Sequence, residues 1–194
     1  MLRRAFMMKT SVMVAAAGIS LAACTTTPPA ASQSGQLGKR QEINSGVDST
    51  LARLYTAAPG SRELVAKARG VLVFPSVVAA GFVVGGQYGE GALRVGGATE
   101  NYYKTLSASV GLQIGAQSKA LIFLFMTQEA LDRFRNSKGW AVGADASVAV
   151  LKIGANGNVD TNSVRAPVQA FVLTNAGLMA NLTLEGTKVS PLGE

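Results

Sequence analysis

A glycine-rich, strongly β-prone stretch at residues 70–97 limits this chain to a small set of folds. Its sequence is GVLVFPSVVAAGFVVGGQYGEGALRVGG. β-Branched and aromatic residues gather in three runs, which predict β segments at residues 71–74, 81–88 and 92–95. Proline and glycine separate the runs, as they do at tight turns and β-bulges. No connection is long enough for the crossover helix that parallel strands need, so we predict antiparallel hairpins.

Helical periodicity occurs before this stretch and once after it. Apolar residues spaced by four, four and three positions predict an amphipathic helix over residues 41–57, which Pro59 and Gly60 end. Ser61 can cap a second, shorter helix through residue 68. Thr127 opens a third helix near residues 128–136.

Apolar runs and alternating patterns predict further strands in the second half of the chain. These strands are expected at residues 102–116, 119–125, 140–153, 167–174 and 178–184. Asn156-Gly157 is a hairpin turn signal, and three strands carry faces of Gly, Ala and Ser, around Gly85, Gly111 and Gly143. The predicted fold is α+β: a mostly antiparallel, strongly curved or barrel-like β-sheet with two N-terminal helices and one further helix near residues 128–136.

The first 23 residues have the architecture of a signal peptide. Arg3, Arg4 and Lys9 form a basic start, and the apolar run that follows is too short to span a bilayer as a helix. Residues 21–24, Leu-Ala-Ala-Cys, then resemble the lipobox of bacterial lipoproteins, in which cleavage before the cysteine leaves it as a lipidated N-terminus. An ordinary secretory signal with a chance cysteine is the alternative. The lipobox is favoured because Cys24 is the only cysteine and lies where the leader ends.

The lipobox implies a protein of the cell envelope that is held by acyl chains such as palmitate. Thr25 stands where an aspartate would be the usual inner-membrane retention signal, which implies the outer membrane and a domain facing the periplasm, with surface exposure as the alternative. Residues 24–38 are rich in Thr, Pro, Ser and Gly and read as a flexible tether. We therefore predict a signal peptide at 1–23, a tether at 24–38 and one folded domain at 39–194.

Composition excludes several classes of function. With no histidine and one cysteine among 194 residues, there is no intrachain disulfide, no histidine acid or base and no Cys/His zinc site. The 11 acidic residues are scattered and form no calcium-binding loop. The formal charge of +7 falls to +4 once Arg3, Arg4 and Lys9 leave with the leader. We expect no metal or other cofactor and no nucleic-acid partner.

Two patterns that could carry chemistry have simpler explanations. The glycines of residues 85–91 fit neither the GxGxxG nor the GxxxxGK[ST] phosphate loop, and a strand rather than a helix follows them. Asp145 and Ser147 share one face of a predicted strand, but no histidine can activate the serine, which leaves only a Ser–Lys arrangement. We expect Asp145 to satisfy a turn or a backbone amide, and we predict that the protein is not an enzyme.

Five segments, taken in order, resemble one known family. They are KARGVLVFP at 67–75, AGFVVGGQYGEG at 80–91, SVGLQIG at 109–115, GADASVA at 143–149 and GLMANLTLEG at 177–186. Together they resemble the SYLF domain, the lipid-binding and Ysc84-type actin-binding family, from about residue 41 to the end. The chain departs from that pattern at residues 101–103, where relatives tend to carry a tryptophan, and at Asn175-Ala176, where serine-lysine is common.

The resemblance implies phosphoinositide binding through a basic amphipathic N-terminal helix and an association with actin, as in eukaryotic relatives. An envelope compartment contains no actin, and phosphoinositides are not its usual lipids. We therefore expect the domain to bind an anionic lipid or another amphiphile at the membrane to which Cys24 anchors it. Basic residues beside the two N-terminal helices are the candidate head-group contacts. They are Lys39, Arg40, Arg62, Lys67 and Arg69.

The alternative function belongs to a different class. A structural envelope protein could engage a protein or peptidoglycan partner through the strands faced with Gly, Ala and Ser, because small residues allow a partner to approach closely. A large exposed apolar or flat small-residue patch would favour this alternative, whereas a groove lined by basic residues would favour lipid.

The leader generates the first testable prediction. The mature chain is expected to start at Cys24 and to carry acyl chains there, whereas Cys24→Ser is expected to accumulate as an unprocessed precursor. Mass spectrometry of the native protein measures both the cleavage site and the modification. A mature protein with an unmodified Cys24, or one cut elsewhere and released in soluble form, would show that the lipobox interpretation is wrong.

Overall fold

The computed structural model describes residues 30–81, 84–110, 117–151, 159, 166–179 and 183–193. The helices are α1 (Ala30–Ala57), α2 (Ser61–Lys67) and α3 (Gln128–Arg135). The strands in the first half are β1 (Gly70–Gly81), β2 (Val84–Val95), β3 (Ala98–Val110) and β4 (Gln117–Phe125). Those in the second half are β5 (Trp140–Ala141), β6 (Val148–Val150), β7 (Val168–Thr174), β8 (Gly177–Leu178) and β9 (Lys188–Pro191).

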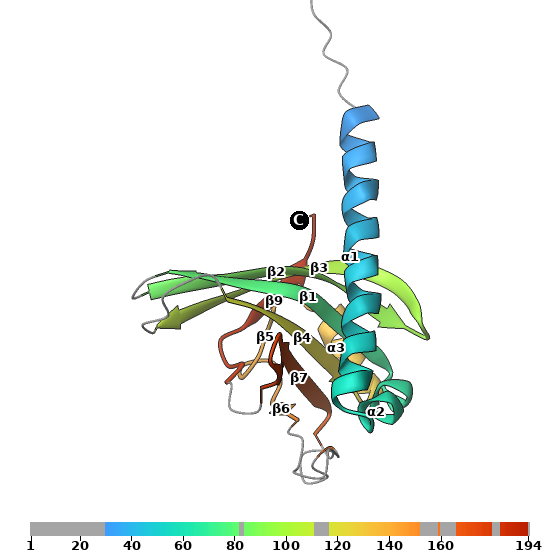
Figure 1. The fold of residues 1–194 in the computed structure, drawn as a ribbon, viewed down its shortest axis with the longest axis vertical. Helices are drawn as coiled ribbons and strands as arrows, with labels where there is room; N and C mark the ends of the chain where they lie inside the picture. Colours follow the sequence, from blue (N-terminus) through green and yellow to red (C-terminus); the bar gives the residue numbers. More distant parts are fainter. Residues whose placement is uncertain are drawn as a thin grey trace, which may run out of the picture.

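The described strands form one strongly curled sheet. Its order is β5-β9-β3-β2-β1-β4-β7-β6, with β8 attached to β7. Every strand pair is antiparallel except β6 with β7. Figure 1 shows α1 standing across one face of the sheet with α2 at its foot, while its N-terminal turns project beyond the strands. The predicted α+β fold, with a curved antiparallel sheet, two N-terminal helices and a third helix near residue 128, is confirmed.

The hairpin of β1 and β2 is confirmed, but its strands are longer than the sequence indicates. β1 continues through Pro75 to Gly81, and β2 unites the runs predicted separately at residues 81–88 and 92–95. Pro75 and Gly91 therefore end no strand. The register of β1 against β2 shifts between Val73 and Ser76, which places Pro75 in a β-bulge, where a missing N–H is tolerated.

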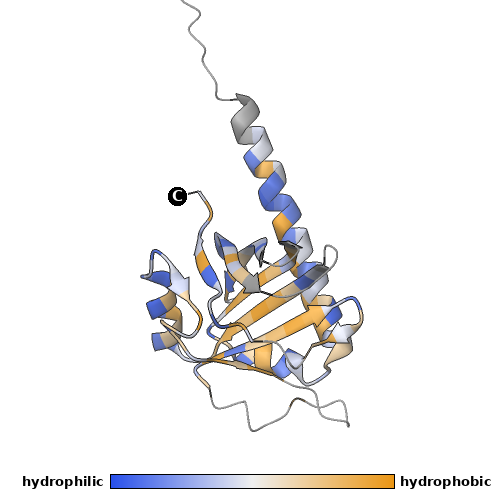
Figure 2. Ribbon diagram, turned by 90° about the vertical axis from the view of Figure 1, so that its left-hand side faces the viewer, coloured by the Kyte–Doolittle hydropathy of each residue, from blue (hydrophilic) through white to orange (hydrophobic). Residues whose placement is uncertain are grey.

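Two hydrophobic clusters hold the sheet, one on each face. Under α1, the fully buried Val47 and Leu54 pack against β1, β2, β4 and β7. On the opposite face α3 packs against an aromatic cluster, in which the Phe134 ring lies 4.8 Å from Phe125 and 5.5 Å from Trp140 between centroids. Figure 2 shows the hydrophobic strands of the sheet and the mostly hydrophilic or neutral projecting turns of α1. The sheet is thus the middle layer, with α1 and α2 on one face and the shorter α3 on the other.

The helix boundaries differ from the predicted ones in two respects. α1 begins at Ala30 rather than at residue 41, and its side chains from residue 34 to residue 42 are exposed, so no apolar periodicity marks these turns. Ser61 does not cap α2: Gly60 takes that position, and the buried Ser61 hydroxyl donates to the Leu54 carbonyl at 3.4 Å. The cap of α3 is as predicted, with Thr127 Oγ1 accepting from the Ala130 N–H at 3.2 Å.

The C-terminal third contains the largest departures from prediction. The strand expected at 140–153 is two short strands, β5 and β6, because the chain turns between them at Gly143, whose φ is +92°. Within the described residues, β8 overlaps the strand expected at 178–184 only at Leu178, and β9 was not predicted. The strand expected at 102–116 is observed as β3 to Val110, and residues 111–116 and the Asn156-Gly157 turn signal lie outside the described residues.

The bulge generates a stability prediction. A Cβ on Gly91 would lie 2.1 Å from the Val73 carbonyl oxygen and 2.7 Å from a Phe74 ring carbon, so Gly91→Ala forces the two strands apart. We expect a loss of about 3 kcal/mol in unfolding free energy, measured by urea denaturation. Gly86→Ala in the same strand is the control: its Cβ would meet nothing within 4 Å, and its effect should stay within about 0.5 kcal/mol. Equal midpoints for the two variants would contradict this account of the bulge.

Candidate functional site: an apolar groove beside α1

A groove of about 700 Å³ lies in the angle between α1 and the sheet. One wall is α1, with Lys39, Glu42 and Ile43 facing the groove, and the floor comes from β1, β2 and β3. Figure 1 shows the reason for this shape: α1 rises away from the strands at its N-terminal end, while β1 and β2 extend sideways beneath it. We call this space the α1 groove.

Close contact between helix and sheet sets the inner end of the groove. A Cβ on Gly46 would lie 3.0 Å from the Pro75 ring, so the glycine lets α1 rest on the bulge of β1. A polar network then fixes the helix against β2 and β3. Asn44 Nδ2 donates to the Tyr102 hydroxyl and Asn44 Oδ1 accepts from the Thr99 hydroxyl, both at 2.9 Å.

Arg94 adds a charged contact on the same side of α1. Its Nη1 lies 2.5 Å from the Asp48 carboxylate, and its Nη2 donates to the Asn44 carbonyl at 3.4 Å. The Arg94 side chain is mostly buried, whereas Asp48 is largely exposed, so solvent screens this ion pair from one side. Together with the Asn44 contacts, it holds the direction in which α1 leaves the sheet.

The floor of the groove carries a strip of exposed apolar side chains. Val78, Tyr88 and Leu106 are 43%, 45% and 47% exposed, although each is in the middle of a strand. Val78 pairs directly with Tyr88 across β1 and β2, and Tyr88 pairs with Leu106 across β2 and β3. Directly paired residues share a face, so the three side chains form one continuous strip about 10 Å long. We call it the apolar strip.

Charged residues lie beside the middle of the apolar strip and at its Leu106 end. Lys39 Nζ of α1 lies 2.6 Å from Glu90 Oε1, and the Tyr88 hydroxyl donates to the same oxygen at 2.5 Å. At the Leu106 end of the strip, the exposed Lys188 of β9 pairs directly with Leu106 of β3. An apolar surface bordered by ammonium groups is suited to a ligand with an apolar part and an anionic part.

The shared carboxylate changes the ionisation of Tyr88 and Glu90. The hydrogen bond to Glu90, supported by burial and the Glu90 charge, raises the pKa of Tyr88 to about 12. Burial of Glu90 opposes its ionisation, but the hydrogen bonds from Lys39 and Tyr88 and the Lys39 charge outweigh burial and lower its pKa. Glu90 is therefore an anion and Tyr88 a neutral donor at neutral pH.

The structure does not gather the five basic residues predicted as head-group contacts. Lys39 lines the α1 groove, while Arg40, one residue on, stacks over the Tyr102 ring at 5.3 Å. Arg62 stacks over the Tyr55 ring at 4.3 Å near the other end of α1. Eighteen helical residues separate Lys39 from the end of α1, which is about 27 Å.

The two remaining basic candidates belong to the foot of the helical layer. The side chains of Lys67, in the last turn of α2, and of Arg69, just before β1, are exposed. Arg69 uses its backbone N–H to bind the Phe125 carbonyl at 2.8 Å. Cys24 lies outside the described residues, and its lipidation stays a prediction. Only Lys39 of the predicted set borders the groove.

The polar pair at residues 145 and 147 does not form a site. Gly143 and Asp145 belong to a turn between β5 and β6 rather than to a strand face shared with Ser147. The Asp145 carboxylate accepts from the Ala141 N–H at 2.6 Å, which is the backbone role predicted for it. One of the three expected Gly/Ala/Ser strand faces is therefore a turn, and the one around Gly111 lies outside the described residues.

The described part of the chain sets two further limits. None of its helices is long and apolar enough to cross a membrane. Within the same residues no group of three or more metal-ligating side chains comes together.

The apolar strip was missed from the sequence for a physical reason. Val78, Tyr88 and Leu106 occur in strands rich in apolar residues, and periodicity assigns such residues to a face without saying what covers it. Their exposure follows from the direction of α1, which depends on contacts of Asn44 and Arg94 between distant parts of the chain. The sequence holds a weak sign that this face is open to solvent, because the charged residues Glu90 and Lys104 share the face of Tyr88 and Leu106.

The carboxylate bridge generates a prediction about titration. Tyrosinate absorbance, measured as the difference between the protein and its Tyr88→Phe variant, should place the pKa of Tyr88 near 12. In Glu90→Gln the charge is lost, and the pKa should fall toward the ordinary value near 10. Because the folded state holds this proton more tightly, the bridge should lose its stabilising effect as pH rises from about 10 to about 12. An unchanged Tyr88 titration in Glu90→Gln would contradict the geometry.

Comparison with known proteins adds a family match to this geometry. The Ysc84 family, described as Las17-binding protein actin regulator, matches residues 106–193. The match begins at Leu106 in β3 and includes β4, α3 and the later strands, whereas the resemblance seen in the sequence begins near residue 41. No curated protein matches the chain. Residues 106–193 therefore match the Ysc84 (SYLF) family that the sequence resembles, and that family is associated with lipid or actin-related binding.

Proposed function

We propose that this protein is an envelope lipoprotein whose SYLF domain binds an anionic amphiphile in the α1 groove. The observation that carries the proposal is the apolar strip: Val78, Tyr88 and Leu106 are nearly half exposed in a row that a helix leaves open. Contiguous exposed apolar side chains on a soluble domain mark surfaces that bind something. The family association with lipid supports the choice of an amphiphile.

The apolar part of the ligand would lie along the strip. Each methylene removed from water contributes about 0.8 kcal/mol, so a chain segment of a few carbons in contact with the strip supplies useful affinity. The wall residue Ile43 continues the apolar surface upward from the floor. Gly86 also lines the groove, and because a Cβ there would meet nothing within 4 Å, it leaves room for a chain.

The anionic part of the ligand would lie at the lysines. Lys39 is half exposed although it is paired with Glu90, so its ammonium can accept a second anionic partner from solvent. Lys188 offers a second cation at the far end of the strip. Each basic residue near an anionic surface contributes about 1 kcal/mol, and salt weakens this contribution.

The anchor is part of the same proposal. Acylated Cys24 would tether the domain to the outer membrane on its periplasmic side, with surface exposure as the alternative. Cys24 precedes the first residue of α1 by only six positions, and the N-terminal turns of α1 project from the domain (Figure 1). A membrane at the anchor would therefore be on the side toward which α1 projects.

Vesicle flotation tests the binding proposal. The mature chain is produced from residue 24 with Cys24→Ser, so that only the domain can hold it on the vesicle. We expect it to float with anionic vesicles at low salt and to remain behind with neutral ones. Leu106→Asp places a charge in the apolar strip and should reduce the bound fraction by about tenfold.

Met179→Asp is the matched control, because Met179 is 42% exposed and does not line the α1 groove. It should float like the parent chain. Equal recovery with neutral and anionic vesicles would refute the role of charge. Equal losses for Leu106→Asp and Met179→Asp would refute the role of the groove.

A further inference from the structure

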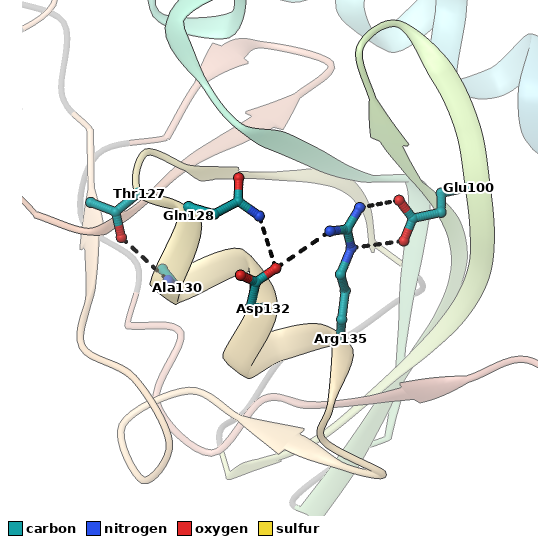
Figure 3. Close-up of polar contacts among 6 residues, drawn as sticks. All are labelled: Glu100, Thr127, Gln128, Ala130, Asp132 and Arg135. Atoms are coloured by element: carbon teal, nitrogen blue, oxygen red, sulfur yellow. Dashed lines mark hydrogen bonds and ion pairs between the residues drawn. The ribbon is translucent and has the colours of Figure 1, made fainter.

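The two flanks of α3 differ in how their charges are satisfied. On one flank, Gln128 Nε2 donates to Asp132 Oδ1 at 2.8 Å, and Arg135 Nη1 lies 3.4 Å from the same oxygen. Arg135 also holds Glu100 of β3 in a two-pronged ion pair, with its Nε donating to Glu100 Oε1 at 2.8 Å. Figure 3 shows this chain of contacts from α3 to β3. The polar side chains of this flank contact one another and Glu100, and these contacts fix the helix to the sheet.

The opposite flank carries Glu129 and Arg133, which make no ion pair or side-chain hydrogen bond within the described residues. Both side chains are exposed. They border a cavity of about 520 Å³ between α3, β5 and the start of β7. This cavity is on the face of the sheet opposite α1, so it is separate from the α1 groove. We call it the α3 cavity.

The α3 cavity has an apolar floor and a polar rim. Trp140 and Val168, both almost fully buried, form its floor with Ala130 and Ala146. Ser147 and Pro167 complete the rim opposite the helix. An apolar floor with a few polar groups around it is the common arrangement of a small-molecule or peptide site.

The charges on the rim specify what such a ligand would carry. Glu129 and Arg133 are four residues apart on one helix, so they lie one above the other at a spacing of about 6 Å. A phosphate or another strong anion would meet the Glu129 carboxylate, which disfavours it. A ligand that has one carboxylate and one ammonium group at the same spacing meets both residues favourably. Two residues of extended peptide span about 7 Å, so the free ends of a dipeptide have this spacing.

We propose that the α3 cavity binds a dipeptide with free termini. Arg133 binds the terminal carboxylate, for which the planar guanidinium is well suited, and Glu129 binds the terminal ammonium. Small apolar side chains of the peptide lie against Ala130 and Ala146, the partly exposed apolar residues of the lining, above Trp140 and Val168. The proposal does not depend on lipid binding in the α1 groove, since the two sites share no residue.

Nuclear magnetic resonance titration with Ala-Ala tests the proposal, using the mature chain with Cys24→Ser. We expect saturable shifts of the Trp140 indole N–H and of the Ala130, Ala146 and Ser147 amides. The C-terminal amide of Ala-Ala and its N-acetyl derivative each lack one charge, and each should bind at least about tenfold more weakly. A dipeptide that causes no saturable shift, or two derivatives that bind as well as Ala-Ala, would overturn the proposal.

Protein variants separate this site from general charge effects. Arg133→Gln should weaken Ala-Ala by about tenfold and leave the amide derivative unaffected, whereas Glu129→Gln should weaken Ala-Ala and leave the N-acetyl derivative unaffected. Lys138→Gln is the matched control, because Lys138 is an exposed cation close to α3 in the sequence that does not line the cavity. Both rim residues are exposed, so circular dichroism should show unchanged folding. Equal affinities of Arg133→Gln and Lys138→Gln for Ala-Ala would overturn the proposal.

Discussion

The close approach of β1 and β2 at the bulge is the constraint on which the rest of the domain depends. β1 lies at the centre of the sheet, between β2 and β4, and α1 rests on it through Gly46 and Pro75. The bulge brings the Val73 carbonyl so close to Gly91 that no side chain fits between them. The same irregularity changes which residues of β1 face α1 beyond Pro75 and so places Val78 on the groove floor. The shape of the groove therefore begins with the backbone of the hairpin.

The direction of α1 converts this backbone geometry into a binding surface. Val47 and Leu54 bury the lower half of the helix on the sheet, while the polar contacts of Asn44 and Arg94 fix its rotation. Above Ile43 the helix leaves the strands, and the apolar strip stays uncovered although its residues would fit a core. Burying the strip under a longer apolar face of α1 would add stability and close the groove. A protein that keeps such a surface open beside two lysines is suited to hold an amphiphile there.

The sequence predicted local structure well and tertiary position poorly. The Thr127 cap, the helix α3 and the strand β4 follow from propensity and apolar runs, which depend on neighbours in the chain. The sequence pattern places strand ends at Pro75 and Gly91 because, without knowledge of the partner strand, a bulge and a turn have the same residues. β9 was missed because four residues with little alternation become a strand only through pairing with β3 and β5. Among the candidate contacts, Lys39 borders the groove, whereas Arg62, Lys67 and Arg69 lie near the foot of α1. The sequence shows that a basic residue is close to a helix, but it does not show which end of the helix that residue adjoins.

Photochemical labelling measures the central claim most directly. An anionic single-chain amphiphile with a photoreactive group in its acyl chain is incubated with the protein, activated by light, and located by peptide mass spectrometry. The account expects adducts on Val78, Tyr88 and Leu106, suppressed by an excess of the unlabelled amphiphile. Met179 and Leu37, which are exposed outside the groove, should stay unlabelled. Labelling that is spread over all exposed apolar residues, or that excess amphiphile does not suppress, would contradict binding in the α1 groove.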